Sequence, residues 1–250
     1  MIEAFERSIL RDAKSAVFRE YCRRVHGVDR FQYNTLTSAH FELLVDRLDL
    51  EPGGSFVDLG CAVGTMTVAV ARRTHARGTG IDFAPAVIDL ARRDAPSDVD
   101  VSFVEGDLNE LHLPPASVDA VMAIDALYFA SDLDQTIEVL LNALRPGGRL
   151  VAFHSAFQGF GGRTADRCPD GTTLAVALRN CGAEIEWTDL SSDDREHWKR
   201  AVTVTEALRS QWEAAGERDA WEARHAENAE IVPLVEAGRS ARFLYVARRP

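Results

Sequence analysis

Residues 57–65 read Val-Asp-Leu-Gly-Cys-Ala-Val-Gly-Thr, and this is the most informative stretch of the sequence. The apolar run before Gly60 is typical of a buried strand, and the residues after Gly64 are typical of a helix. Two glycines at this spacing allow a tight backbone turn and let a ligand approach the main chain. The G-x-G-x-x-G spacing of dinucleotide-binding turns is not met, because Ala62 and Thr65 stand at two of its glycine positions.

Short β-like runs alternate with helical stretches around this turn. We expect strands at 55–59, 78–82, 101–105, 118–124, 150–154, 184–188 and 241–247. We expect helices at 65–74, 85–93, 133–144 and 172–180. Such alternation is typical of α/β proteins with a doubly wound, mostly parallel sheet, and these bind ligands beyond the carboxyl ends of their strands.

Two regions lie outside this alternation. Apolar residues recur every four positions over residues 1–26, which predicts one amphipathic helix, and a second helix is expected at 38–48. Residues 191–238 look helical, and they are far longer than an ordinary connection of about 2–6 residues. We interpret them as a cap over the ligand site or as a partner-binding helical pair.

Composition excludes several classes of protein. The 250 residues are 46% hydrophobic, which is ordinary for a folded domain, and no apolar run approaches the ~18 residues that span a bilayer. A net charge of −11 argues against nucleic-acid binding, which needs a basic surface. The four cysteines have no C-x-x-C spacing, so no zinc ribbon is expected. Charged residues near the start exclude a signal peptide there, and we expect a cytoplasmic protein with no membrane association.

Acidic residues follow or end three successive strands. Asp58 stands two residues before the first glycine, where a carboxylate attracts a cationic ligand and repels a pyrophosphate. Asp82 closes the next strand and suits the hydroxyl groups of a ribose. Asp107, after the third strand, is placed for the exocyclic amine of an adenine, with Leu108 against its face. The three residues together predict a nucleoside-binding site.

These motifs resemble those of the class I S-adenosylmethionine-dependent methyltransferases, over about residues 48–181 and the last strand. The glycine motif corresponds to residues 58–64, the ribose acid to Asp82, and the adenine motif to residues 106–108. The segment 119–126 and the Leu-Arg-Pro-Gly-Gly run at 144–148 also match. Ala62 departs from the pattern, because the family usually has glycine there, so the methionine end of the cofactor is expected to sit slightly differently.

The resemblance implies a fold and a cofactor. The expected sheet has seven strands in the order 3-2-1-4-5-7-6, with strand 7 antiparallel. The expected cofactor is S-adenosyl-L-methionine, whose sulfonium needs no metal for activation. The resemblance also implies that the N-terminal helices and the cap inserted between strands 6 and 7 cover the substrate. They look most like the caps of methyltransferases for small molecules, including those of natural-product pathways.

The expected site combines cofactor-binding and catalytic residues. His154 ends the fifth strand and is a candidate general base, while Tyr128 follows the fourth strand and is a candidate for the acceptor pocket. The expected cofactor-binding residues are Asp58, Gly60, Ala62, Gly64, Thr65, Asp82, Phe83, Gly106, Asp107, Leu108, Asp125 and Gln32.

We expect three parts in the chain: an N-terminal helical lid at 1–50, a cofactor-binding domain at 51–190 plus 241–250, and a helical cap at 191–240. The predicted activity is methyl transfer by in-line displacement to a small-molecule acceptor. Two alternatives stay open at this point. One is a non-catalytic S-adenosylmethionine-binding module with a partner-binding helical insertion. The other, which the glycine spacing disfavours, is a nicotinamide-dependent oxidoreductase. The sequence leaves open whether the chain forms a homo-oligomer.

Overall fold

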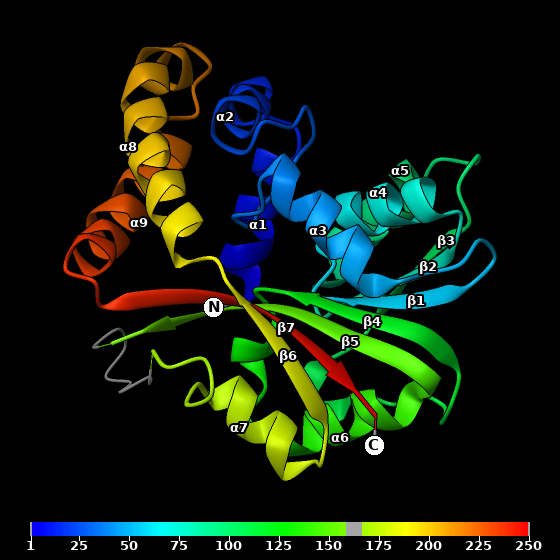
Figure 1. The fold of residues 1–250 in the computed structure, drawn as a ribbon. Coiled ribbons are helices and arrows are strands. Elements are labelled where there is room, and N and C mark those ends of the chain that lie inside the picture. Colours follow the sequence, from blue (N-terminus) through cyan, green and yellow to red (C-terminus); the bar gives the residue numbers. More distant parts are fainter. Residues whose placement is uncertain (1, 159–166, 250) are drawn as a thin grey trace.

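A computed structural model describes residues 2–158 and 167–249, and its centre is a seven-stranded sheet (Figure 1). The strand order is β3-β2-β1-β4-β5-β7-β6, which confirms the expected order. β7 runs antiparallel to both of its neighbours, and the other pairs are parallel. The strands are β1 (Ser55–Leu59), β2 (Arg77–Asp82), β3 (Val101–Glu105), β4 (Val118–Ile124), β5 (Leu144–Phe157), β6 (Glu184–Asp189) and β7 (Ser240–Arg248).

Helices cover both faces of the sheet (Figure 1). One face carries α3 (Ser38–Leu48), α4 (Thr65–Thr74) and α5 (Pro85–Asp94), and the other carries α6 (Leu133–Ala143) and α7 (Thr173–Asn180). Two short 3₁₀ turns, η1 (Leu108–Glu110) and η2 (Leu127–Phe129), follow β3 and β4. The apolar strand residues alternate between the two layers, with Val121 and Ala123 in one core cluster and Ala120 and Met122 in the other.

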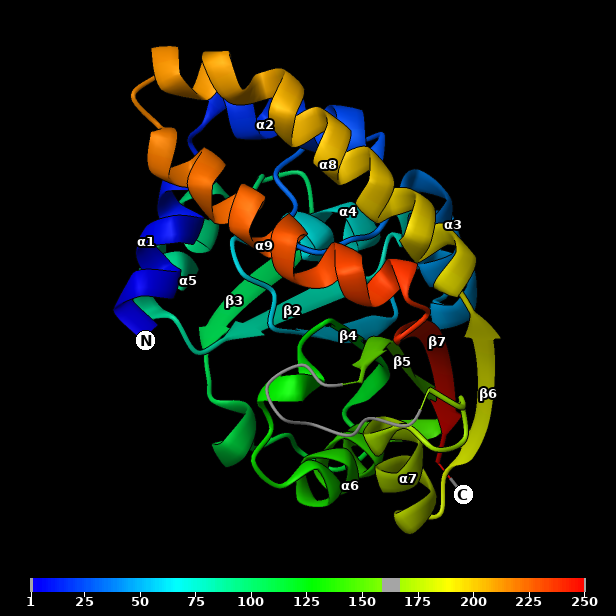
Figure 2. The ribbon, with the colours of Figure 1, turned by 90° about the vertical axis from the view of Figure 1, so that its left-hand side faces the viewer.

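Four helices form a lid at one end of the sheet (Figure 2). They are α1 (Ile2–Asp12), α2 (Ala16–His26), α8 (Ser191–Ala214) and α9 (Arg218–Glu236). Residues from all four share one buried cluster, which includes Ile9, Phe18, Trp212 and Ile231. α1 and α2 lie near the start of the chain, and α8 and α9 follow about 200 positions later. This common core therefore joins the two ends of the chain.

The expectation of one helix over residues 1–26 is wrong, because the chain forms two. Residues 13–15 interrupt the helix, and Ser15 has extended backbone angles of φ −76° and ψ 121°. Its hydroxyl oxygen accepts a hydrogen bond from the Phe18 backbone N–H and thereby caps α2. The apolar spacing continues across this break, so periodicity alone does not reveal it.

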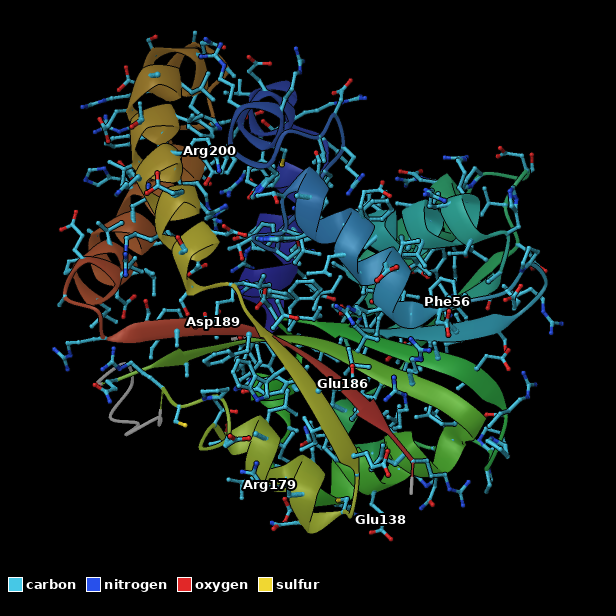
Figure 3. The ribbon with its side chains drawn as sticks, viewed as in Figure 1. Phe56, Glu138, Arg179, Glu186, Asp189 and Arg200 are labelled. Atoms are coloured by element: carbon cyan, nitrogen blue, oxygen red, sulfur yellow. The ribbon has the colours of Figure 1, made fainter. Side chains whose placement is uncertain are left out.

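The other expected elements are present, with small changes at their ends. β5 extends well past the expected 150–154, because its residues 155–157 pair with Ser240–Arg242 of β7. β6 is the edge strand opposite β3, and Glu186 and Asp189 lie on it (Figure 3). The expected lid at 1–50 includes α3, whose Leu44 and Leu48 pack in the sheet cluster with Phe56 rather than in the lid cluster. None of the described helices is both long and apolar enough to cross a membrane.

We predict that Gly64→Ala destabilises the fold more than Gly53→Ala. Both glycines have positive φ angles, +76° and +81°, which cost an alanine about 1–2 kcal/mol. An added Cβ at Gly64 would lie 2.3 Å from the buried Phe103 ring, whereas nothing lies within 4 Å of one at Gly53. Overpacking should therefore lower the free energy of unfolding of Gly64→Ala by about 1–3 kcal/mol more, as measured by urea denaturation. Equal losses in the two variants would contradict the packing at Gly64.

Candidate functional site

A cavity of about 590 Å³ lies at the carboxyl ends of β1, β2 and β4, and residues of the lid line it. This volume suits one small-molecule ligand. Eleven of the twelve residues expected to bind the cofactor line it. The exception is Gly64, which lies at the start of α4, directly beside Thr65. The lid contributes Phe5, Ile9 and Glu227 to the walls, and the chain between α2 and α3 contributes residues 31–34.

Asp82 is held in place by the backbone of two loops. Its Oδ2 accepts a hydrogen bond from the Ala62 N–H at 2.9 Å, and its Oδ1 accepts one from the Ala84 N–H at 3.1 Å. Burial raises the pKa of this carboxyl group, although the backbone donors oppose the shift. The next residue, Phe83, stacks on Phe5 of α1 with ring centroids 5.6 Å apart. Asp82 therefore has the fixed position that binding of ribose hydroxyls requires.

Asp58 is a buried carboxyl group in the cavity wall. Only 2% of its surface is exposed, and its Oδ2 accepts a hydrogen bond from the Thr67 hydroxyl at 2.6 Å. Burial raises its pKa to about 7, because the charged form loses its hydration. A cationic ligand beside Asp58 would favour the charged form.

The turn between β1 and α4 has positive φ angles at three alternate positions. They are 69° at Gly60, 48° at Ala62 and 76° at Gly64. Alanine is disfavoured in this left-handed region, so Ala62 is a strained position. The turn keeps the Ala62 N–H directed at Asp82, which compensates for part of that strain. This is where the chain departs from the glycine pattern of the resembled family.

Gln32 brings an unpartnered hydrogen-bond acceptor to the cavity. Only 2% of the residue is exposed, and its Nε2 donates to the backbone carbonyl of Leu36. Its Oε1 is buried and has no hydrogen-bond partner in the described structure. Nearby, the Thr65 hydroxyl donates to the Phe31 carbonyl at 2.7 Å and ties this segment to α4. A bound ammonium or amide group is the kind of donor that Gln32 lacks.

The segment after β3 supplies the opposite end of the cavity. Gly106, Asp107 and Leu108 all line it. Asp107 Oδ1 accepts hydrogen bonds from the backbone N–H of Asn109 at 2.8 Å and from its Nδ2 at 2.7 Å. These contacts fix the Asp107 carboxylate in the cavity lining, where it can accept a hydrogen bond from an adenine amine. Glycines, Asp82, Asp107 and the unpartnered Gln32 thus fit S-adenosylmethionine.

Asp125 lines the cavity, but its carboxylate is already paired. Its two oxygens each lie 2.8 Å from a nitrogen of Arg242 on β7, and its Oδ1 also accepts from the Tyr128 hydroxyl at 3.1 Å. The Arg242 side chain is only 2% exposed and also donates to the Ser155 hydroxyl. This pair holds Asp125 at a positive φ of 55°. Asp125 therefore offers its backbone to a ligand more readily than its carboxylate.

Tyr128 and His154 lie together, and neither is among the residues that line the cavity. Their rings are tilted by 31° to each other with centroids 4.7 Å apart, and the Tyr128 hydroxyl accepts a hydrogen bond from the Ser155 N–H. Burial lowers the pKa of His154 to about 4, so this histidine is neutral and weakly basic at pH 7. Their expected catalytic roles stay predictions, and the contacts observed favour positioning of Asp125.

Several residues of the site were not expected from the sequence. Glu227 and Arg242 belong to no sequence motif. Glu227 pairs with Arg224, one turn earlier on α9, and Arg242 pairs with Asp125 of a distant part of the chain. The apolar spacing of α1 indicated that Phe5 and Ile9 are buried, but not that they face a ligand cavity. The glycine and acidic motifs are local sequence patterns, whereas the places of these four residues depend on the fold.

We predict that Arg242→Met lowers the free energy of unfolding by about 3–5 kcal/mol, because it leaves the partly buried Asp125 carboxylate without its cation. The double variant Arg242→Met/Asp125→Asn should recover part of this loss. Arg248→Met is the matched control on β7, because Arg248 pairs with Glu186 at the surface and should contribute less than about 1 kcal/mol. Urea denaturation measures all three. Similar losses at Arg242 and Arg248 would contradict the buried ion pair.

We predict that Asp58→Asn changes the pH dependence of stability. A carboxyl group whose pKa is raised to about 7 on folding binds more protons in the folded state, so the wild type loses stability from about pH 4 to pH 7. The advantage of Asp58→Asn should grow over that range, by at most about 1.4 kcal/mol per pH unit. Urea denaturation at several pH values tests this, with Asp98→Asn as an exposed control. An advantage that does not change with pH would rule it out.

Comparison with known proteins identifies the family. Residues 56–148 match the family model described as a methyltransferase domain. The chain is 30% identical over 207 residues to the 27-O-demethylrifamycin SV methyltransferase of Amycolatopsis mediterranei, covering 74% of this chain and 76% of that protein. It is 36% identical over 113 residues to the methyltransferase GfsG of Streptomyces halstedii, covering 44% of this chain and 41% of that one.

Structure comparison agrees on the fold. The crystal structure of the [4+2]-cyclase SpnF matches with a TM-score of 0.70 and 23% identity, over 96% of this chain and 94% of that one. The chain spans about two-fifths or less of the length of the first curated relatives it matches. With the sheet order, the strand-end carboxylates and the rifamycin methyltransferase match, the chain belongs to the class I S-adenosylmethionine-dependent methyltransferases.

Proposed function

We propose that this protein transfers a methyl group from S-adenosylmethionine to a small-molecule acceptor by in-line displacement. The observation that carries the proposal is the cavity, in which Asp58, Asp82 and Asp107 line one wall and the lid lines the other. The cofactor, when bound, supplies a methyl group on a positively charged sulfur. An acceptor lone pair forms the new bond to carbon as the sulfur–carbon bond breaks, and the sulfur keeps that electron pair.

The protein's own part in the reaction is alignment and exclusion of water. Asp82 and Asp107 fix the nucleoside end, and the buried Asp58 favours positive charge beside β1. The lid helices cover the strand ends with apolar side chains, among them Phe5 and Ile9. Alignment of two reactants in this way can supply about 7–11 kcal/mol. A base is needed only for acceptors that must lose a proton.

The relatives favour a natural-product acceptor. The name of the Amycolatopsis protein places its substrate among the rifamycins, and the apolar lid cavity suits an apolar small molecule. SpnF bears the name of a cyclase on the same fold, so the fold alone does not decide the reaction. Experiment decides whether the protein is instead a non-catalytic binding module. The expected cytoplasmic location is a separate prediction that also needs an experiment.

We predict one binding site per chain for S-adenosylmethionine and for S-adenosylhomocysteine, without added metal. Asp82→Ala should weaken binding at least about 100-fold, because two charge-assisted hydrogen bonds of roughly 1.5–3 kcal/mol each are lost. Asp89→Ala, an exposed acid of α5, is the control and should bind normally. Titration calorimetry measures both, and circular dichroism checks the fold. Normal affinity in a folded Asp82→Ala variant would exclude Asp82 as the ribose acid.

The transfer itself is tested with methyl-labelled S-adenosylmethionine and a crude metabolite extract. The wild type should produce a labelled small molecule, and Asp82→Ala should produce much less at the same cofactor concentration. Cofactor binding without any labelled product would instead support the non-catalytic binding module.

A further inference from the structure

The cavity has an unusual charge balance for a ligand site. Five carboxylates line it: those of Asp58, Asp82, Asp107, Asp125 and Glu227. No arginine, lysine or histidine is among the described residues of the lining. Asp125 and Glu227 are paired with arginines that lie outside the lining, whereas Asp58, Asp82 and Asp107 have only neutral donors. The cavity is therefore electronegative.

Glu227 is the carboxylate that the lid contributes. Its Oε2 lies 2.8 Å from Arg224 Nη1, one turn earlier on α9, and the Glu227 side chain is 42% exposed. Arg224 is only 13% exposed, its guanidinium lies 4.8 Å from the centre of the Tyr33 ring, and its Nη2 donates to the Tyr33 hydroxyl at 3.1 Å. Arg224 thus holds both Glu227 and Tyr33 at the cavity wall.

The two side chains offer complementary hydrogen bonds. Burial raises the pKa of Tyr33, so its hydroxyl keeps its proton at neutral pH and can donate it. Glu227 offers a carboxylate oxygen as an acceptor. The side chains around them, Phe5, Ile9, Phe31 and Phe83, are apolar. The buried Oε1 of Gln32, which lacks a donor, is a further sign that this cavity holds a polar ligand.

We propose that the acceptor is a neutral or cationic molecule with an apolar body, and that Glu227 and Tyr33 bind its polar group. The inference rests on the proposed function, because it places the acceptor between the bound cofactor and the lid. Asp82 and Asp107 already outnumber the one net positive charge of S-adenosylmethionine, and Asp58, whose pKa is raised to about 7, adds to the excess when it ionises. An anionic acceptor would therefore meet like charge, with no basic side chain among the described lining residues to balance it.

Two dyes that differ by one charge test this inference. N-phenyl-1-naphthylamine is neutral, and 1-anilinonaphthalene-8-sulfonate has the same rings with one added sulfonate. Each is titrated by fluorescence into the full chain saturated with S-adenosylhomocysteine. The neutral dye should bind at least tenfold more tightly than the sulfonate.

Two variants test whether Glu227 causes the preference for the neutral dye. Glu227→Gln should reduce the preference for the neutral dye at least threefold, because Arg224 then lacks its counter-charge. Glu230→Gln lies three residues further along α9, is exposed, and should leave the preference unchanged. Equal or tighter binding of the sulfonate, the same preference in Glu227→Gln, or no binding of either dye would each overturn the inference.

Calorimetry on the same samples shows whether the acceptor class or the proposed function has failed. If S-adenosylhomocysteine binds and the dyes behave otherwise than expected, only the acceptor class is wrong. If S-adenosylhomocysteine itself does not bind, the proposed function fails, and the acceptor class fails with it.

Discussion

Negative charge gathered at the carboxyl ends of the parallel strands is the constraint on which the site depends. Burial opposes ionisation of Asp58 so strongly that its pKa rises to about 7, and Asp82 is shifted in the same direction. No basic side chain among the described residues of the cavity wall relieves this cost. A protein keeps such carboxylates where a ligand supplies the missing positive charge or hydrogen-bond donors. The sulfonium, ammonium and ribose hydroxyl groups of S-adenosylmethionine meet that need.

The lid adds apolar walls to the cavity at the strand ends. Its helices come from both ends of the chain and share one apolar core, with Phe18 and Trp212 among its buried members. Polar contacts reinforce the junction: Arg11 of α1 pairs with Asp219 of α9, and Ser15 donates to Glu217. The shared core and these contacts tie α1 to α9, and both helices line the cavity.

Local sequence patterns predicted most of the sheet, because strand alternation, glycine turns and strand-end acids depend on neighbouring residues. The family resemblance then supplied the strand order. The break at Ser15 was missed because the apolar spacing continues through it. The Asp125–Arg242 pair joins residues 117 positions apart, and no local pattern encodes such a contact. For the same reason His154, at the end of a central strand, gave no sign of turning toward Tyr128 rather than the cavity.

A crystal structure of the protein with S-adenosylhomocysteine tests most directly whether the strand-end carboxylates form the cofactor site. The account predicts the ribose hydroxyls within hydrogen-bond distance of Asp82, the adenine beside Asp107 and Leu108, and the amino group near Gln32 Oε1. It also predicts that the remaining space beside the sulfur faces Tyr33 and Glu227. A ligand bound elsewhere, or one whose ribose makes no contact with Asp82, would contradict the account.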